Sequence, residues 1–189
     1  MNAACLEAAG LFVVGVNPNN GHNLPTQRMN QNPTLALEPP RFERGKAILI
    51  AGLTGRYQVK QVEGIPAQWQ RFSPYLGTLP GQVGRKAYGV CYNGDQAGGF
   101  DYLCGVEVAS LVGLPPKLSS VSIPEQRYAV FAHRGPRSRL GETFAAIWNR
   151  WLPGSGHQAA ESPSFELYPE DFDPQANATG VEVWVPIRA

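Results

Sequence analysis

The octapeptide PSFELYPE, residues 163–170, takes the place in the second half of the chain that KAYGVCYN, residues 86–93, takes in the first half. Both segments have the aromatic and aliphatic residues of a β-strand. A carboxylate, Glu166, stands in the middle of the second segment, where the first has Gly89. The pattern alone leaves two places open for this carboxylate: the exposed face of a half-buried sheet, or a cavity that holds a negative charge.

Shorter matches around these segments indicate an internal duplication. The tetrapeptide GVEV at residues 105–108 recurs at residues 180–183, and WQRF at residues 69–72 is echoed by WNRW at residues 148–151. These matches keep one order along the chain. Because chance repeats have no reason to keep an order, the sequence predicts two copies of one structural unit.

Each half reads as a strand, a helix and two further strands. The strands are expected at residues 46–58, 86–93 and 100–109, and again at 126–135, 164–168 and 180–188. Apolar residues at helical spacing predict one helix that begins near Ile65 and another that begins near Leu140. Pro66 suits the first turn of the first helix, where a missing N–H group costs nothing. Proline and glycine end both helices, at residues 74–77 and 153–154.

Two such units predict an α+β fold: a duplicated strand–helix–strand–strand unit whose antiparallel sheet carries both helices on one face, with a groove between the halves. Residues 1–40 are rich in Asn, Pro and Gln after an apolar start, and we expect them to form an N-terminal arm. Residues 41–189 are expected to form the domain. Its first half covers about residues 41–112 and its second half about residues 113–189.

Superposing the halves places Gly89 where the second half has Glu166, and Cys91 where it has Tyr168. Because side chains alternate along a strand, the helix-covered face carries either these four residues or their sequence neighbours. In the first case one half leaves space and the other projects a carboxylate into it. Such a carboxylate is costly to ionise without a partner. A cationic ligand would supply that partner, and each aromatic face would add a cation–π attraction of about 0.5–2 kcal/mol.

The composition argues against several other classes of function. The chain has 189 residues and a formal net charge of +1, with no basic stripe for nucleic acid. Its three cysteines and three histidines have no metal-ligand spacing, so we expect no metal and no cofactor. The apolar run near the N-terminus lacks a basic leader and is too short to cross a bilayer. We therefore expect a cytoplasmic protein with reduced thiols and no membrane partner.

Eight stretches stand in the order of a known family: LEPPRFERGKAILIAGLTGRY (37–57), IPAQWQRF (65–72), YGVCYN (88–93), FDYLCGVEV (100–108), IPEQRYAVFAHRG (123–135), FAAIWNRWLP (144–153), FELYPEDF (165–172) and GVEVWVPI (180–187). They resemble the GyrI-like, or AraC-type regulator effector-binding, domain family, whose fold is a duplicated strand–helix–strand–strand unit. In its multidrug-binding members, an acidic residue in the segment matching FELYP meets the positive charge of the bound drug. The resemblance therefore implies that Glu166 binds the ligand. It also implies aromatic walls, which we assign to Trp69, Trp148, Tyr92, Phe131 and Tyr168.

The sequence departs from the regulators of this family in one respect. Those regulators join the domain to a helix–turn–helix DNA-binding domain, whereas here about 40 residues with no helical periodicity and no basic recognition helix precede it. We therefore expect a free-standing effector-binding protein, a form that the family also takes in mobile gene cassettes of bacteria, with no direct contact to nucleic acid.

Three functions remain open on the sequence. We favour a binding protein for lipophilic cationic small molecules, with Glu166 as the charge partner. The alternative is a hydrolase of reactive electrophilic small molecules, as in some free-standing relatives, with Glu166 as general acid or base aided by Tyr92 or Tyr168. The third is a protein-interaction module, as in gyrase-modulating relatives. The sequence does not separate binding from catalysis, and it indicates neither the natural ligand, nor the oligomeric state, nor a particular protein partner.

Overall fold

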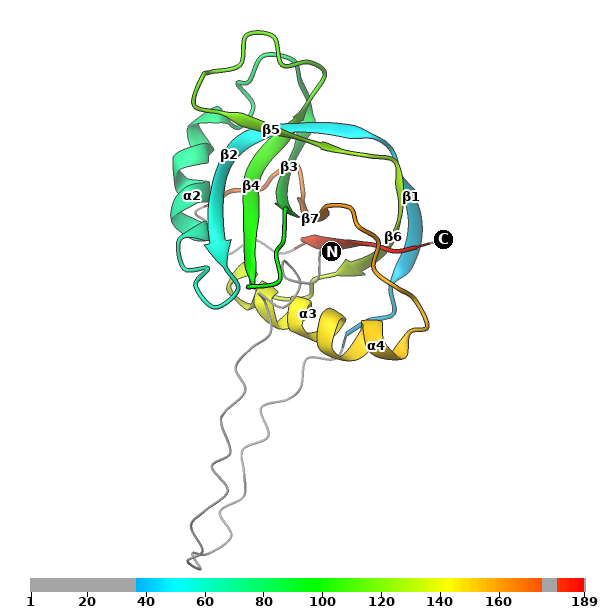
Figure 1. Ribbon diagram of the computed structural model, residues 1–189. Helices are drawn as coiled ribbons and strands as arrows, with labels where there is room; N and C mark the ends of the chain where they lie inside the picture. The colour runs from blue at the N-terminus through cyan, green and yellow to red at the C-terminus, as the bar shows by residue number, and fades with distance from the viewer. Residues whose placement is uncertain (1–36, 175–179, 189) are drawn as a thin grey trace, which may run out of the picture.

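The computed structural model describes residues 37–174 and 180–188, which form one eight-stranded sheet and two helical regions (Figure 1). Most of the predicted arm, residues 1–36, lies outside the described residues. The strands β1 to β8 span Arg41–Gly45, Ile48–Gln58, Gln82–Tyr92, Gly99–Val108, Ser119–Ile123, Gln126–Ala132, Ser164–Tyr168 and Glu182–Pro186. The helical elements are α2 (Ile65–Phe72), the 3-10 turns η1 (Ser73–Tyr75) and η2 (Arg137–Arg139), α3 (Leu140–Ala146), the π-helical turn η3 (Ile147–Trp151) and α4 (Leu152–Gly154).

The duplication is visible in the order of the sheet, β1-β6-β8-β7-β3-β4-β2-β5. The first unit is β2-α2-β3-β4, and the second is β6, the helical region from α3 to α4, β7 and β8. The two units meet where β3 pairs with β7 in antiparallel register, with Gly89 directly opposite Glu166. The predicted α+β class, with an antiparallel sheet and two helical regions, is confirmed.

The strand register corrects one of the sequence matches. Gly89 on β3 pairs with Cys104 on β4, and Glu166 on β7 pairs with Val183 on β8. Cys104 and Val183 are therefore equivalent, so the two GVEV segments are not superposed. The mismatch is an even number of residues, and an even shift keeps every side chain on the same face of a strand. The face assignments made from the sequence survive for this reason.

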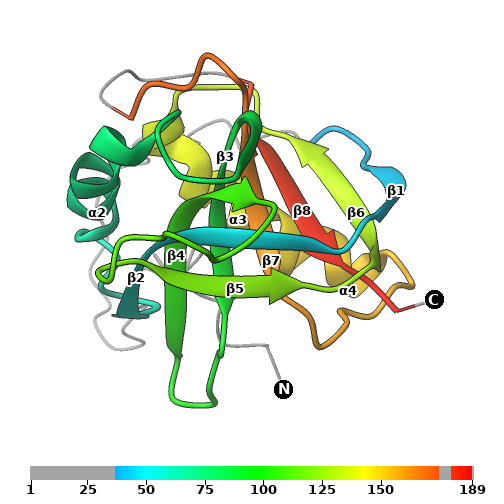
Figure 2. The same cartoon turned by 90° about the horizontal axis from the view of Figure 1, so that it is seen from above.

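The sheet closes on itself through two strands that the sequence did not predict. β1 and β2 run as one bent strand against β5 and β6, in one continuous antiparallel register from Arg41–Val130 to Gly52–Ser119. Because β6 and β2 border the two sides of the central strands, this ribbon joins one side of the sheet to the other. Figures 1 and 2 show it crossing the molecule from β2, which lies beside α2, to β1 on the opposite side.

The curled sheet separates two apolar cores, one on each face. The helix-covered core includes Trp69, Phe72, Cys104, Phe131, Phe144 and Tyr168. The core enclosed by the curl includes Ile50, Tyr88, Leu103, Tyr128, Phe165 and Trp184. Neighbouring residues of β3 and β7 thus belong to different cores, as period-two alternation requires. Of the two sets left open by the sequence, the one with Gly89, Cys91, Glu166 and Tyr168 faces the helices.

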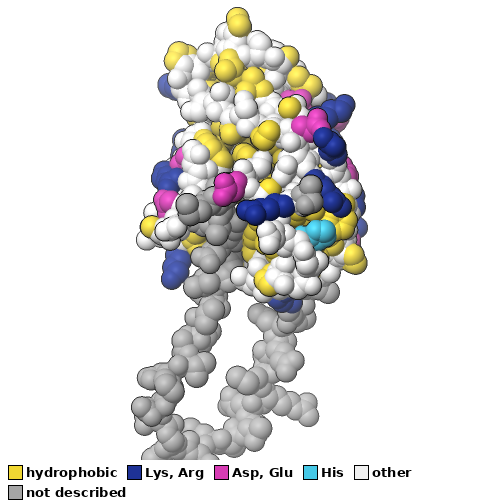
Figure 3. Space-filling model, turned by 45° about the vertical axis from the view of Figure 1, so that its right-hand side comes forward, with side chains coloured by type: hydrophobic (Ala, Val, Ile, Leu, Met, Phe, Trp, Pro, Cys, Tyr) yellow, Lys and Arg dark blue, Asp and Glu magenta, His cyan; other side chains and the backbone are white. Residues whose placement is uncertain are grey.

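Charged side chains of both signs are mixed on one face of the molecule. On the face shown in Figure 3, basic and acidic side chains lie close to one another around the sides, and that face has no continuous basic patch. Within residues 37–174 and 180–188, no helix is long and apolar enough to cross a membrane.

The close packing of β2 between β4 and β5 leads to a testable prediction for Gly52, which lies on β2. A Cβ atom at Gly52 would stand 2.0 Å from the backbone oxygen of Cys104. We expect Gly52→Ala to lower the free energy of unfolding by roughly 1–3 kcal/mol, because the strands must separate to admit the methyl group. Urea denaturation measures the loss.

Gly154 provides the matched control, since a Cβ atom there meets nothing within 4 Å. Gly154→Ala is expected to be neutral or to stabilise the protein by about 0.4–1 kcal/mol. Equal unfolding midpoints for Gly52→Ala and Gly154→Ala would contradict the close approach of β2 to β4.

Candidate functional site

Glu166 lies in the middle of β7 and points toward the helices, with 8% of the residue exposed. Two phenol hydroxyls donate hydrogen bonds to its Oε2 atom: Tyr168 from the same strand at 2.5 Å and Tyr102 from β4 at 2.8 Å. A carboxylate has about four acceptor positions. These two bonds fix the orientation of the carboxylate and leave room for a further polar or charged partner.

Trp69 extends this hydrogen-bonded group to helix α2. Its Nε1–H donates to the hydroxyl oxygen of Tyr102 at 2.9 Å, and its ring packs edge-on against Tyr168 with 5.0 Å between centroids. Consecutive hydrogen bonds thus run from the indole of Trp69 to the phenol of Tyr102 and from there to the carboxylate of Glu166. The chain joins α2, β4 and β7, which come from both halves of the protein.

Gln68, the neighbour of Trp69, fixes the helix in this position. Its side-chain amide donates to the backbone oxygens of Leu53 at 2.7 Å and Tyr102 at 3.0 Å, and its Oε1 accepts from the Tyr57 hydroxyl at 2.6 Å. A buried amide that satisfies its partners in this way resists displacement, because each lost bond leaves an unpaired polar group. Gln68 therefore holds α2 against β2 and β4, and with it the indole of Trp69.

Gly89 supplies the space that the carboxylate occupies. A Cβ atom on Gly89 would lie 2.2 Å from the hydroxyl oxygen of Tyr102 and 2.4 Å from Oε2 of Glu166. Both distances are far inside van der Waals contact. The absence of a side chain on β3 is thus a condition for the hydrogen bonds that Glu166 receives from its neighbours.

Burial dominates the electrostatics of the site. It raises the pKa of Glu166 above the ordinary value, while the hydrogen bonds from Tyr168 and Tyr102 and the charge of Arg137 act in the opposite direction. Burial, together with the charge of Glu166, also raises the pKa of Tyr102 and Tyr168 well above the usual range. Both phenols therefore stay protonated and act as donors. The site is a desolvated acid that a nearby positive charge would stabilise in its ionised form.

Aromatic rings cover the carboxylate. Phe172, in the turn that follows β7, lies 4.2 Å from Tyr168 and 5.0 Å from Trp69 between ring centroids. Its residue is 9% exposed. The ring of Phe172 therefore packs against both of the aromatic side chains, Trp69 and Tyr168, that belong to the hydrogen-bonded group of Glu166.

The structure brings together two of the five aromatic residues assigned to the walls from the sequence, Trp69 and Tyr168. Phe131 lies on the same face, but Val183 separates it from Glu166 across the sheet, and its ring packs on Trp151 at 4.8 Å.

Among the described residues, the other two assigned side chains make no ring contact with Trp69 or Tyr168. Trp148, on η3, packs against the helix-covered core, and its indole nitrogen is buried with no hydrogen-bond partner among the described residues. Tyr92 is a correction: it packs against the core on the opposite face of the sheet, and its hydroxyl lies 3.2 Å from Thr54 Oγ1. Tyr92 and Gly89 are an odd number of residues apart on β3, so their side-chain directions are opposite.

Sequence reasoning missed Tyr102, Gln68 and Phe172. A signal for Tyr102 exists, because alternation along β4 places it on the same face as Cys104, and the hairpin pairs it with Cys91. Gln68 and Phe172 carry no such signal. Their roles depend on how a helix and a turn pack on the sheet, which no local pattern encodes.

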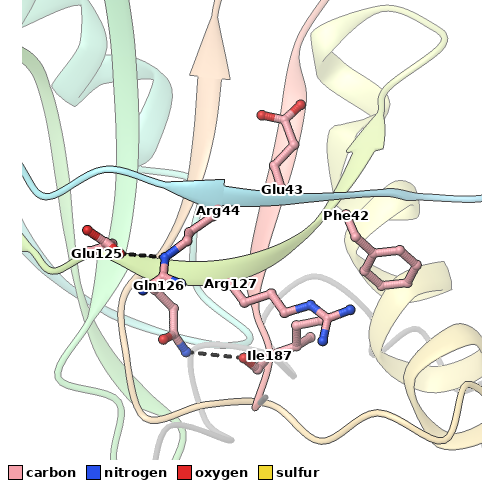
Figure 4. A pocket seen from close by; sticks show the side chains of 7 residues that line it. All are labelled: Phe42, Glu43, Arg44, Glu125, Gln126, Arg127 and Ile187. Carbon is pink, nitrogen blue, oxygen red and sulfur yellow. Dashed lines mark hydrogen bonds and ion pairs between the residues drawn. The ribbon is translucent and has the colours of Figure 1, made fainter.

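A separate depression of about 370 Å³ lies at β1 and β6, with β8 between β6 and β7 in the sheet (Figure 4). Arg44 pairs with Glu125 across it at 2.5 Å, and the guanidinium of Arg127 lies 5.6 Å from the centre of the Phe42 ring. Both arginines therefore have partners already. The depression offers no unmatched acid to a cation, which separates it from the Glu166 site.

The remaining reactive groups are bound into the core. Burial raises the pKa of the Cys104 thiol to about 12, so this cysteine stays protonated. His133 is held between Thr143 and the backbone oxygen of Pro136, at 2.7 and 3.0 Å. Among the described residues, no three His, Cys, Asp or Glu side chains gather as a metal site.

The close approach at Gly89 leads to a prediction for the site. We expect Gly89→Ala to destabilise the protein by roughly 1–3 kcal/mol, because the methyl group displaces the Tyr102 hydroxyl and the Glu166 carboxylate. The cost should shrink in a Tyr102→Phe background, where the nearest clashing atom is gone. A double-mutant cycle in urea measures this coupling, and strict additivity would contradict the proposed contact.

The raised pKa of Glu166 predicts a pH dependence of stability. Since its folded pKa lies above the unfolded value near 4.5, the folded state binds the extra proton, and stability falls as pH rises through the folded pKa. A glutamine keeps an oxygen for both phenols but carries no charge. We therefore expect Glu166→Gln to be more stable than the wild type at about pH 8, by about 1.4 kcal/mol for each unit of the shift.

The difference should disappear as pH falls below the unfolded value near 4.5, because Glu166 then becomes neutral in both the folded and the unfolded chain. Urea unfolding midpoints across this range measure it, with all other titrating groups shared by the two proteins. A wild type that remains as stable as Glu166→Gln at about pH 8 would overturn the raised pKa.

Solved structures of several proteins share this fold. The structure of SAV2435 bound to tetraphenylphosphonium has a TM-score of 0.64 and 18% identity, and the match covers 80% of this chain and 94% of that one. The integron cassette protein VCH_CASS2, from the mobile metagenome of Vibrio cholerae, has a TM-score of 0.60 and 18% identity, over 80% of this chain and 97% of that one. At such identities the likeness shows the fold alone.

Sequence comparison leads to the same group of proteins. The transcriptional regulator BrlR of Pseudomonas aeruginosa is 31% identical over 124 residues, which cover 63% of this chain and 44% of the regulator. The chain thus matches less than half of the length of that regulator. The model of the family described as the GyrI-like small molecule binding domain matches residues 38–188. The chain therefore belongs to the family of GyrI-like small molecule binding domains.

Proposed function

We propose that this protein binds lipophilic cationic small molecules, with Glu166 as the charge partner and Trp69 and Tyr168 as packing surfaces. The observation that carries the proposal is the buried carboxylate of Glu166, which is hydrogen-bonded to two phenols and surrounded by aromatic rings. An acid in such a place is a functional-site candidate, because its ionised form lacks a full complement of partners.

The charge of the ligand follows from the physics of this site. Removing a carboxylate from water is expensive, and the cost falls when a positive charge comes close. The faces of Trp69 and Tyr168 attract the same cation through their ring quadrupoles. An anion would be repelled by Glu166, and a neutral compound would gain only the apolar contact. The site therefore selects for charge as well as for size.

The proposal agrees with what is known of similar folds. The SAV2435 structure contains tetraphenylphosphonium, a large apolar cation, which is a property of that protein. BrlR is a regulator, and the match with this chain covers less than half of its length. We propose that this chain binds small molecules, as the description of its family states, and that it either sequesters the compound or signals its presence to a separate partner.

Tetraphenylphosphonium and tetraphenylborate test the charge selectivity, since they have the same shape and opposite charge. We expect the wild type to bind the phosphonium and to bind the borate far more weakly. Glu166→Gln should weaken phosphonium binding by about 30-fold or more, equivalent to about 2 kcal/mol, because the ligand charge loses its partner. Isothermal titration calorimetry gives both dissociation constants.

The Gln variant separates charge pairing from general apolar contact, since its shape is conserved. Borate binding should be unchanged or tighter in Glu166→Gln. An equal loss of affinity for both ions in Glu166→Gln, or no loss for either ion, would count against Glu166 as the charge partner. Ligand-induced stabilisation in thermal melts provides an independent check on the affinities.

A further inference from the structure

The ring of Phe172 is an internal occupant of the Glu166 site. It follows β7 in a short turn, in which its backbone N–H donates to the backbone oxygen of Pro169 at 3.1 Å. Turn residues commonly point to solvent, yet this ring is buried against Tyr168 and Trp69, the aromatic residues next to the carboxylate. The turn thus inserts one phenyl group into the space that the proposed ligand would need.

Arg137, on η2, also contacts this ring. Its guanidinium carbon lies 5.6 Å from the centre of the Phe172 ring, and its Nη2 donates to the backbone oxygen of Pro174 at 2.5 Å. One side chain therefore contacts the turn at two points. A ring nitrogen of His133 forms a hydrogen bond with the backbone oxygen of Pro136, the residue before Arg137. This bond fixes the backbone from which the arginine side chain extends.

The charge of Arg137 is not fully matched. Its Nη1 atom is buried and has no hydrogen-bond partner among the described residues. A buried donor atom without a partner is unfavourable. The favourable terms that offset this are its contact with the Phe172 ring, its bond to Pro174 and its attraction to the negative charge of Glu166.

We infer that Phe172 and Arg137 together act as an internal pseudo-ligand, an aryl ring with a delocalised cation beside it, which a bound compound must displace. This inference rests on the proposed function and adds a mechanism of selection to it. The pair presents the same two groups that the site is proposed to attract. A competing ligand has to replace both: an aromatic surface against Trp69 and Tyr168, and a positive charge within about 6 Å of it to satisfy Glu166.

The displacement lowers the observed affinity by the fraction of molecules in which the site is open. A compound that supplies only the aromatic surface, or only the charge, displaces both Phe172 and Arg137 but replaces the interactions of one of them. Its binding is therefore disfavoured. A small cation without rings and a neutral polycyclic compound should therefore both bind poorly. The pseudo-ligand also accounts for the burial of Glu166, of which 8% is exposed.

The experiment measures tetraphenylphosphonium binding to Phe172→Ala and Arg137→Gln by calorimetry. If the open form is populated at about 0.1–10%, removing the ring raises the affinity by about 10-fold to 1000-fold. Arg137→Gln should also bind the cation more tightly, because the ligand becomes the nearest positive charge for Glu166. Arg137→Lys, which keeps the charge but loses the planar group, should show a smaller gain.

Two matched variants control for general effects. Arg139 lies on the same 3-10 turn but pairs with Glu142 at the surface, so Arg139→Gln should leave the affinity unchanged. Phe42→Ala removes an exposed ring on β1, remote from the site. Phe172→Leu, which keeps an apolar side chain without the ring, serves if the alanine variant does not fold, and it should also gain affinity.

The outcomes separate this inference from the proposed function. Tighter binding by the Phe172 and Arg137 variants, with binding lost in Glu166→Gln, supports both. If the wild type binds through Glu166 but the Phe172 and Arg137 variants bind equally or more weakly, the two residues are part of the ligand's wall and the pseudo-ligand is refuted. If neither the wild type nor any variant binds the phosphonium, the proposed function fails and the inference fails with it.

Discussion

The hydrogen bonds that two tyrosines donate to Glu166 are the interaction on which the arrangement of this protein depends. Tyr102 comes from the first half and Tyr168 from the second, so the carboxylate is satisfied only when β4 and β7 stand in their observed register. Burial of an acid is tolerated in proteins when hydrogen bonds accompany it. The two halves are thus tied together at a polar contact that is also the proposed ligand site, and a shift of register would abolish both.

Duplication explains why the site lies where it does. Two copies of a strand–helix–strand–strand unit bring equivalent strands, β3 and β7, into contact at the pseudo-symmetry axis, and identical residues there would face one another. The copies have diverged at that point. The first half has Gly89 and Cys91 where the second has Glu166 and Tyr168, so one strand provides volume and the other fills it with an acid and a phenol. An internal repeat alone would give two equal surfaces, whereas this divergence gives one asymmetric site.

Much of this could be predicted from the sequence, because the decisive patterns are local. Alternation in the strand around Glu166, compared with its copy, indicated which residues share the face of the acid and that Gly89 leaves space on that face. The same alternation, applied consistently, would have excluded Tyr92, which is an odd number of residues from Gly89. The closing ribbon of β1 and β5 could not be predicted, since its pairing joins segments far apart in sequence with no distinctive pattern. Phe172 was missed for a related reason: its burial depends on a turn folding back onto the sheet.

The inferred occupation of the site by Phe172 and Arg137 balances ligand selectivity against the stability of the folded protein. A protein that must bind a hydrophobic cation has to keep an acid among aromatic rings, and an open chamber of that kind would expose apolar surface to water and leave the acid unmatched. Packing Phe172 against Trp69 and Tyr168, and placing Arg137 over that ring, reduces both problems at the expense of affinity. The burial of Glu166 and the unpartnered Nη1 atom of Arg137 each oppose this closed state. These unfavourable terms keep the closed state within the few kcal/mol that a ligand can overcome. A compound that supplies both an aromatic surface and a positive charge relieves both terms together, and the geometry therefore favours ligands in which the two properties are combined.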